Sequence, residues 1–175
     1  GGRAWRRAPL EVGAAGASAR TVRPQRGAAG ASARGTRVAG YSGQVTAKTL
    51  DHPFFARMWT VMSAHETPLM RRLRAENLAG LSGRVLEVGA GTGTNFAFYP
   101  DTVTQVVAVE PEVGLAPKAR EAAAAAPVPV TVVESTIEAM GEVEPFDAVV
   151  CSLVLCSVDD PGAVLRQLNS VLKPG

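Results

Sequence analysis

The second half of the chain alternates short apolar runs with segments of helical pattern, and this alternation restricts the fold more than any other feature. Four runs have the composition of strands, at residues 84–88, 105–110, 128–133 and 146–151. Stretches with helical character follow three of them, at residues 92–99, 113–126 and 161–172. Strands that are apolar along their whole length are typical of a parallel sheet covered by helices on both faces. With right-handed crossovers, the sequence predicts an α/β fold built on a doubly wound, Rossmann-like parallel sheet.

The first 44 residues have a different character, being built from Gly, Ala, Arg and Ser. The octapeptide GAAGASAR occurs twice, at residues 13–20 and 27–34, and the segment carries a net charge of +7 against −5 for residues 45–175. A segment with so few large apolar side chains cannot offset its ordering entropy. We therefore predict that residues 1–44 form a disordered tail. Three interpretations of this segment are possible: a mis-assigned start of the protein, a transit peptide and a basic arm that binds nucleic acid. We favour the first, with the true start near Val45.

Between this tail and the first strand, large apolar side chains recur at helical spacing, with Pro68 at a break or in a first turn. They are Phe54, Phe55, Met58, Trp59, Met62, Leu69 and Leu73. We predict cap helices within residues 45–83, followed by a cofactor-binding domain over residues 84–175. Because the sequence ends soon after the fourth strand and its helix, we expect a domain that is truncated there and incomplete at its C-terminal end.

A glycine-rich stretch, LEVGAGTGTN at residues 86–95, lies where the first strand gives way to the next segment. Glycines at 89, 91 and 93 allow a tight turn and a close approach of backbone to ligand. In open parallel sheets, ligands lie beyond the carboxyl ends of the strands, where helix N-termini offer N–H groups. A P-loop is excluded because no lysine follows the glycines, and a dinucleotide fingerprint would require glycine where Thr94 stands. An NAD-dependent oxidoreductase is therefore disfavoured but stays an alternative.

An acidic residue, Glu110, ends the second strand seventeen residues after Gly93. A carboxylate in this place can accept hydrogen bonds from both hydroxyls of a ribose. The combination of glycine loop, strand and acid therefore predicts a site for a nucleoside-containing cofactor.

These residues resemble the first motif of class I S-adenosylmethionine-dependent methyltransferases, an acid followed by GxGxG. Glu87 matches the acid, residues 89–93 the glycine pattern, and Glu110 the ribose-binding acid. Residues 146–175 are similar to the ubiquinone-biosynthesis, or methyltransferase type 11-like, branch. Three segments most resemble thiol methyltransferase-like proteins of the methyltransferase-like-7 type: HPFFARMW (residues 52–59), GTNFAFYP (93–100) and LVLCSV (153–158). The resemblance implies a seven-stranded sheet, of which this chain supplies four strands.

The resemblance also implies a role for individual residues. The glycine loop would hold the methionine portion of S-adenosylmethionine, Glu87 would lie near its amino group and Glu110 would bind the ribose. The loops after the second and third strands would contact the adenine, although the family often has an acid where Thr136 stands. Ser152 and Leu153 would line the methyl-transfer site. The full implied cofactor set is Glu87, Gly89, Ala90, Gly91, Thr92, Gly93, Asn95, Glu110, Pro111, Thr136, Ile137, Ser152 and Leu153.

The resemblance implies transfer of a methyl group to a small, hydrophobic acceptor, which could be a thiol, a quinone-like ring or a lipid headgroup. A catalytically inactive cofactor-binding fragment is the main alternative. A base is needed only if the nucleophile arrives protonated. The sole candidate base is His52, although a His-Pro pair at a helix start is more often structural.

Several classes of function are disfavoured by the sequence. Cys151 and Cys156 lack His or acidic partners at metal-ligand spacing, so we expect no metal. No apolar run reaches the ~20 residues that span a bilayer, so we expect no integral membrane segment. The two cysteines form neither a disulfide framework nor a CxxC pair, so we expect a reducing, cytoplasmic setting. The mild acidity of residues 45–175 argues against a nucleic-acid partner. The sequence gives no indication of oligomeric state.

Overall fold

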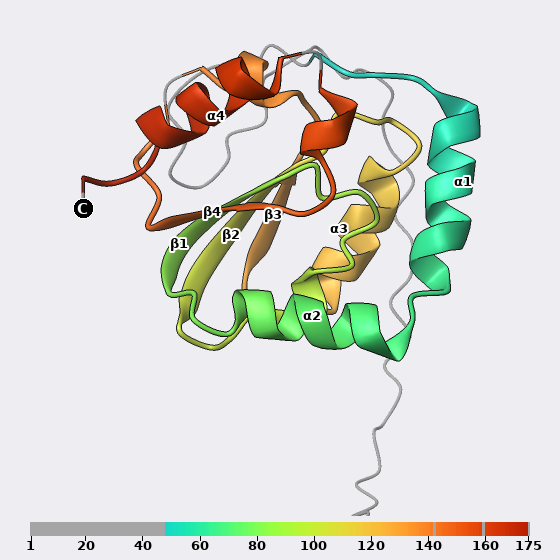
Figure 1. The fold of residues 1–175 in the computed structure, drawn as a ribbon, viewed down its shortest axis with the longest axis horizontal. Helices are drawn as coiled ribbons and strands as arrows, with labels where there is room; N and C mark the ends of the chain where they lie inside the picture. Colours follow the sequence, from blue (N-terminus) through green and yellow to red (C-terminus); the bar gives the residue numbers. More distant parts are fainter. Residues whose placement is uncertain (1–47, 142, 159, 175) are drawn as a thin grey trace, which may run out of the picture. The chain divides into compact units, whose positions relative to one another are not determined.

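The computed structural model describes residues 48–141, 143–158 and 160–174. The tail predicted for residues 1–44, and the start proposed at Val45, lie outside the described residues. The part of the chain that is described folds as four strands, four α-helices and short 3₁₀ turns (Figure 1).

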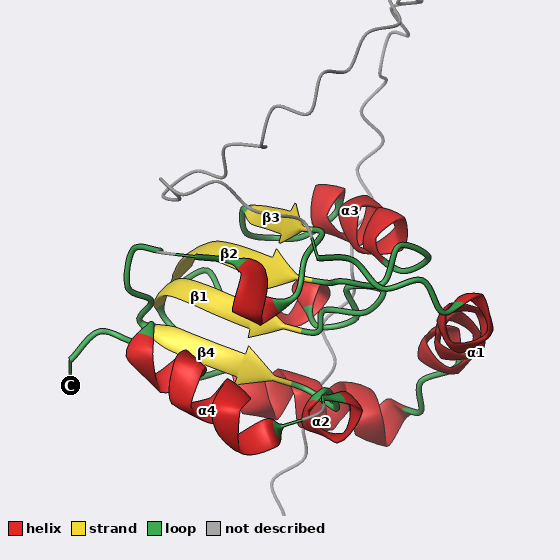
Figure 2. Cartoon of the chain, turned by 90° about the horizontal axis from the view of Figure 1, so that it is seen from above, coloured by secondary structure: helices red, strands yellow, loops and turns green. Residues whose placement is uncertain are grey.

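The sheet has the order β3-β2-β1-β4, and each neighbouring pair is parallel. Its strands are β1 (Gly83–Val88), β2 (Val103–Val109), β3 (Val130–Val133) and β4 (Ala148–Cys151). The central strand β1 pairs with β2 and β4, so Val88 lies between Val109 and Cys151 in register. All four strands point the same way, and their carboxyl ends meet at one edge of the sheet (Figure 2). The predicted Rossmann-like parallel sheet is confirmed.

Side chains alternate between two buried clusters, one on each face of the sheet. In β1, Leu86 and Val88 pack into the cluster that contains α4 (Pro161–Ser170), whereas Val85 packs into the cluster that contains α3 (Ala116–Ala124). Successive side chains of a strand point to opposite faces, and here both faces are covered, which explains why the strands are apolar throughout.

The helix predicted over residues 92–99 is wrong. Turns occupy residues 91–95, and only a 3₁₀ turn, η1 (Phe96–Phe98), follows. Gly91 and Gly93 have φ of 59° and 79°, which lies outside the helical region. Tyr99 is extended, as expected of a residue that precedes Pro100, so the helix has neither a regular start nor room to continue.

Two helices precede the sheet, α1 (Pro53–Ala64) and α2 (Pro68–Leu78), each with proline in its first turn. The side chain of Thr67 caps α2 by accepting a hydrogen bond from the N–H of Met70 over 3.2 Å. Helix α1 stands beyond the carboxyl ends of the strands (Figure 2). In the described part of the chain, no helix is long and apolar enough to cross a membrane, and no group of three or more His, Cys, Asp or Glu residues could hold a metal ion.

Candidate functional site

The glycine loop turns sharply at the carboxyl end of β1. Gly89, Gly91 and Gly93 all have positive φ, between 59° and 79°. The N–H groups of Gly89 and Ala90 donate to the carbonyl of Val109, at 2.9 and 3.1 Å, which fastens the loop to the end of β2. A side chain at Gly91 would place its Cβ 2.6 Å from Nε1 of Trp59, a residue of α1. Glycine is therefore required here both by the backbone conformation and by the helix that lies over the loop.

Glu110 lies directly beside this loop, as the sequence predicts. Its Oε2 accepts a hydrogen bond from the N–H of Gly91 over 2.6 Å, and its Oε1 accepts one from the N–H of Glu112 over 2.9 Å. Its carboxylate is buried, and this burial raises its pKa, while the two backbone hydrogen bonds lower it. A carboxylate offers about four lone-pair sites, so two remain for the hydroxyls of a ligand.

Glu87 lies behind the glycine loop and is 2% exposed. Its two oxygens accept hydrogen bonds from Asn95 Nδ2 at 2.9 Å and from the Tyr99 hydroxyl at 2.6 Å. Burial raises the pKa of Glu87 to about 7, against the lowering effect of these two bonds and of the nearby charge of Arg74. Glu87 therefore supports the loop from within the protein, and its contact with the amino group of a cofactor stays a prediction.

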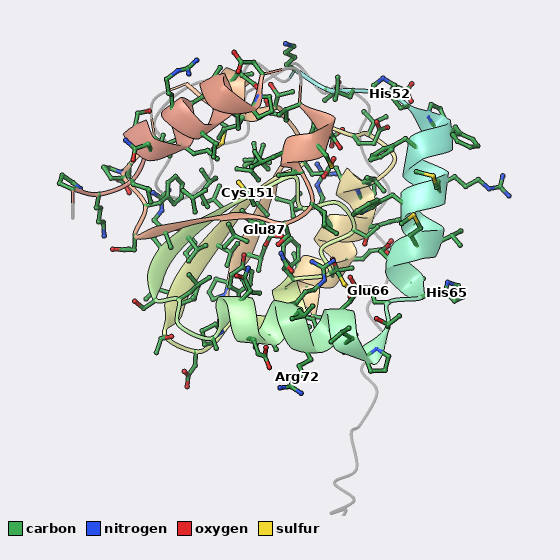
Figure 3. The ribbon with its side chains drawn as sticks, in the orientation of Figure 1. His52, His65, Glu66, Arg72, Glu87 and Cys151 are labelled. Atoms are coloured by element: carbon green, nitrogen blue, oxygen red, sulfur yellow. The ribbon has the colours of Figure 1, made fainter. Side chains whose placement is uncertain are left out.

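Sequence reasoning missed the residues that connect Glu87 to the cap helices. Arg74 of α2 donates through Nη1 to Asn95 Oδ1 over 2.8 Å, and through Nε to Glu66 over 2.7 Å. The Arg74 and Glu66 side chains are only 9% and 11% exposed. Figure 3 shows Glu66 near the junction of the two cap helices, while Arg72, two positions before Arg74, points away from the protein. No sequence motif marks Arg74, and only its helical phase relative to Leu78 indicates that it faces inward. Tyr99 lies within the segment GTNFAFYP that carries the resemblance, but nothing in that segment indicates a contact with Glu87.

Asn95 also reaches the carboxyl end of β4, because its Nδ2 lies 3.1 Å from the hydroxyl of Ser152. The next residue, Leu153, has a φ of 58° and a side chain that is well exposed. A positive φ is uncommon for a residue other than glycine and costs on the order of 1–2 kcal/mol. The structure thus brings Ser152 and the glycine loop together at one edge of the sheet, and it holds Leu153 in a strained conformation beside them.

The loop after β3 contains the predicted adenine contacts. Ile137 is buried, and the N–H of Thr136 donates to the carbonyl of Lys48 over 3.1 Å. Among the described residues, the hydroxyl of Thr136 is buried without a hydrogen-bond partner. Pro111, on the neighbouring loop, accepts a bond from the N–H of Leu50.

His52 lies at the start of α1, and its side chain is 63% exposed (Figure 3). Its Nδ1 is 3.2 Å from Oε2 of Glu112, and its backbone N–H contacts both oxygens of the same carboxylate at 3.0 Å. Its role as a base stays a prediction. Cys151 and Cys156 are both free thiols, and Cys156 is exposed. Burial raises the pKa of the Cys151 thiol.

A cavity of about 260 Å³ opens between α1, the glycine loop and α3. It is lined by Thr60, Ser63, Ala64, Thr92, Lys118 and Glu121. The hydroxyls of Thr92 and Ser63 are 3.0 Å apart, so α1 contacts the loop at this cavity as well as through Trp59.

A glycine loop after one strand and a carboxylate after the next, at the carboxyl edge of a parallel sheet, is the arrangement with which Rossmann-like folds hold a nucleoside-containing cofactor. Residues 86–175 match the family model described as a methyltransferase domain. The chain belongs to this family, and the resemblance to class I methyltransferases related to thiol methyltransferases is confirmed.

Relatives with this likeness include the thiol S-methyltransferase TMT1B of Mus musculus, which is 36% identical over 134 residues, covering 70% of this chain and 54% of the mouse protein. Thiol S-methyltransferase TMT1A of Homo sapiens is 34% identical with the same two coverages. The chain spans about half the length of these relatives. A SAM-dependent methyltransferase from Thiobacillus denitrificans, solved with S-adenosyl-L-homocysteine, has a TM-score of 0.56 at 21% identity, over 72% of this chain and 54% of that one. This likeness shows the fold alone.

Proposed function

We propose that this domain binds S-adenosylmethionine and that the protein transfers its methyl group to a small acceptor. The observation that carries the proposal is the hydrogen bond between Gly91 and Glu110 at the carboxyl edge of the sheet. This bond joins the glycine loop to the acid that is predicted to bind the ribose, and residues 86–175 match the methyltransferase domain.

Three features of the described residues fit such a cofactor. The positive φ of the loop glycines allows the tight turn that such a cofactor loop makes after its strand. Glu110 retains lone pairs for two ribose hydroxyls. The unpartnered hydroxyl of Thr136 lies at the loop predicted to contact the adenine, and a buried hydroxyl without a partner costs free energy that a ligand donor or acceptor would recover.

When bound, the cofactor supplies a methyl group that is already activated by the sulfonium. The chain's own task is to hold the acceptor in line with that methyl group, which can contribute on the order of 7–11 kcal/mol. Ser152 and Leu153 stand at the end of β4, beside Asn95, in the place where the acceptor would lie. An acceptor that arrives as an anion needs no base from the protein.

A small hydrophobic thiol is the acceptor that we propose. The support is the similarity to thiol S-methyltransferases, at 34–36% identity. The exposed apolar side chain of Leu153 next to the predicted site is also suited to a hydrophobic acceptor. In the transfer, the thiolate sulfur bonds to the methyl carbon, and the electron pair of the breaking bond returns to the cofactor sulfur. The thiol proton passes to solvent before attack.

Calorimetric titration of S-adenosylhomocysteine tests the binding step. We expect micromolar binding by the chain and at least a thirtyfold loss in Glu110→Ala, since hydrogen bonds to a charged group contribute about 1.5–3 kcal/mol each. Glu144→Ala, at an exposed position away from the loop, is the matched control. No binding by folded protein would overturn the proposal, and binding of NADH instead would favour an oxidoreductase.

Turnover is tested by incubating the protein with S-adenosylmethionine and one acceptor of each class: an alkyl thiol, a hydroquinone and a phospholipid. Mass spectrometry should detect the methyl thioether together with S-adenosylhomocysteine. Methylation of another class would move the assignment to that acceptor. Binding without any turnover would favour a catalytically inactive cofactor-binding protein.

A further inference from the structure

The segment that precedes α1, residues 48–52, runs across the loops that follow β2 and β3. Leu50 donates its N–H to the carbonyl of Pro111 over 2.8 Å and accepts a bond from the N–H of Val113 over 3.0 Å, which forms a parallel bridge opposite Glu112. The carbonyl of Lys48 accepts from the N–H of Thr136. This segment, which we name the strap, therefore holds both loops that are predicted to contact the adenosine.

The strap is fastened at its C-terminal end by one buried side chain. Glu112 is 3% exposed, and its carboxylate accepts the backbone N–H of His52 on both oxygens at 3.0 Å as well as facing the ring Nδ1 at 3.2 Å. His52 is the N-cap residue of α1 and makes no side-chain cap of its own. Glu112 thus places a carboxylate at the N-terminus of α1, where the helix dipole favours negative charge.

The same residue also contacts the predicted ribose acid, because the N–H of Glu112 donates to Glu110 Oε1 over 2.9 Å. Glu110 in turn accepts from the N–H of Gly91. A continuous hydrogen-bonded path therefore runs from the glycine loop through Glu110 and Glu112 to the first residue of α1.

Helix α1 returns to the glycine loop further along its length. The indole of Trp59 lies against Gly91, and the hydroxyl of Ser63 lies 3.0 Å from that of Thr92. The N-terminus of α1 is held by Glu112, whereas few of its other side chains are buried, Ala56 being the one that is buried fully. The position of α1 over the loop thus depends strongly on the contact between Glu112 and His52.

We propose that Glu112 is a positioning residue: it fastens the strap and the start of α1 over the cofactor site, and it holds Glu110 in the orientation that binds the ribose. This inference rests on the proposed function. It assigns to Glu112 no contact with the cofactor itself.

Three substitutions in the full chain test the proposal by calorimetric titration of S-adenosylhomocysteine. Glu112→Ala removes the carboxylate and should weaken binding about tenfold, the effect of losing one to two net hydrogen bonds. Glu112→Gln keeps an acceptor for the N–H of His52 and should restore most of the affinity. His52→Ala removes only the ring contact and should weaken binding about twofold. Glu144→Ala should bind as the wild type does.

Hydrogen exchange distinguishes positioning from general destabilisation. In Glu112→Ala, amides of α1 should exchange faster with and without S-adenosylhomocysteine, while amides of β1 and β2 keep their protection. The same exchange pattern should appear more weakly in Glu112→Gln. Because glutamine has nearly the same shape as glutamate, this variant serves for the measurement if Glu112→Ala folds poorly.

Wild-type affinity in a folded Glu112→Ala variant with faster exchange in α1 would overturn the proposal, since α1 would then be free without consequence for the ligand. Affinity in Glu112→Gln as low as in Glu112→Ala would also overturn it, because the acceptor for the N–H of His52 would then make no difference. Uniform loss of protection over the whole sheet would also overturn it, because Glu112 would then serve the fold as a whole. Failure of the wild type to bind S-adenosylhomocysteine would instead refute the proposed function.

Discussion

The backbone N–H of Gly91 donates to the carboxylate of Glu110 over 2.6 Å, which joins the loop after β1 to the acid after β2. Nineteen positions separate the two residues in the sequence. Their contact exists because β1 and β2 are adjacent and parallel, so that the segments leaving both strands meet at the same edge. Substitutions on either side of this contact test the site separately from the fold.

Gly91→Ala should destabilise the protein by about 1–3 kcal/mol and abolish binding of S-adenosylhomocysteine. The alanine would have to adopt a φ of 59°, and its Cβ would lie 2.6 Å from Trp59. Urea unfolding and calorimetry measure the two effects. Gly80→Ala is the control, because a Cβ at Gly80 meets no atom within 4 Å. Equal behaviour of the two variants would contradict the strain that we assign to the loop.

Stability should fall as the pH rises from 4.5 to about 7, because of Glu87. Burial raises its pKa from 4.5 to about 7 in the folded state, so the folded protein keeps a proton that the unfolded chain has released. This contribution is fully present below pH 4.5 and is lost as the pH passes 7, with a total on the order of 3 kcal/mol. The raised pKa of Glu110 acts in the same direction.

Urea unfolding of the wild type and of Glu87→Gln at pH 5 and pH 7.5 checks this prediction. The variant should show a clearly smaller pH dependence, since glutamine does not titrate. Glu76→Gln, at an exposed position on α2, should keep the wild-type dependence. If the free energy of unfolding of Glu87→Gln changed with pH as much as that of the wild type, groups other than Glu87 would be the cause of the pH dependence.

Arg74→Met should destabilise the protein by about 1–3 kcal/mol. The substitution leaves Glu66 and Asn95 without the partner that now bonds to both in a nearly buried setting. Arg72→Met, on the outer face of the same helix, breaks the exposed pair with Glu76 and should change the free energy of unfolding by no more than about 0.5 kcal/mol. The pair of variants is compared by urea unfolding, and similar losses would argue against a specific role for the inner arginine.

Leu153→Asn should leave the free energy of unfolding unchanged or raise it by roughly 0.5–1 kcal/mol, because asparagine tolerates a positive φ better than leucine. The matched change Leu165→Asn, at an exposed position of helix α4, should lower it by about 0.5 kcal/mol. Thermal unfolding measures both. If Leu153 contacts the acceptor, KM for the thiol should rise in Leu153→Asn while the affinity for S-adenosylhomocysteine stays constant.

Much of the predicted cofactor site at the carboxyl edge of the sheet could be predicted from the sequence alone. Apolar runs identified the four strands, and the rule that ligands lie beyond the carboxyl ends of parallel strands placed residues 89–93 and Glu110 together. The helix expected after the loop was wrong because positive-φ glycines and Pro100 together leave space for only a 3₁₀ turn. The helix propensity of residues 92–99 was therefore a poorer guide to this segment than Gly91, Gly93 and Pro100.

The contacts of Arg74, Tyr99 and Glu112 could not be predicted, because each joins segments whose relative position the sequence does not encode locally. In the sequence, Arg74 and Glu112 cannot be told apart from the charged residues that helices and loops commonly expose to solvent. In the folded chain, Arg74 bonds to Asn95, and Glu112 is buried against His52, sixty positions away.

The class of fold, the family and the loop–strand–acid arrangement could be predicted from local patterns, because strand composition and glycine spacing are local properties. In a parallel sheet these local features come together at one edge. The side chains that support this edge are known only from the folded chain: Tyr99 and Asn95 lie behind Glu87, and Glu112 holds the strap and α1. Burial and hydrogen-bond partners depend on how distant segments pack, and packing is a property of the whole domain rather than of any stretch of its sequence.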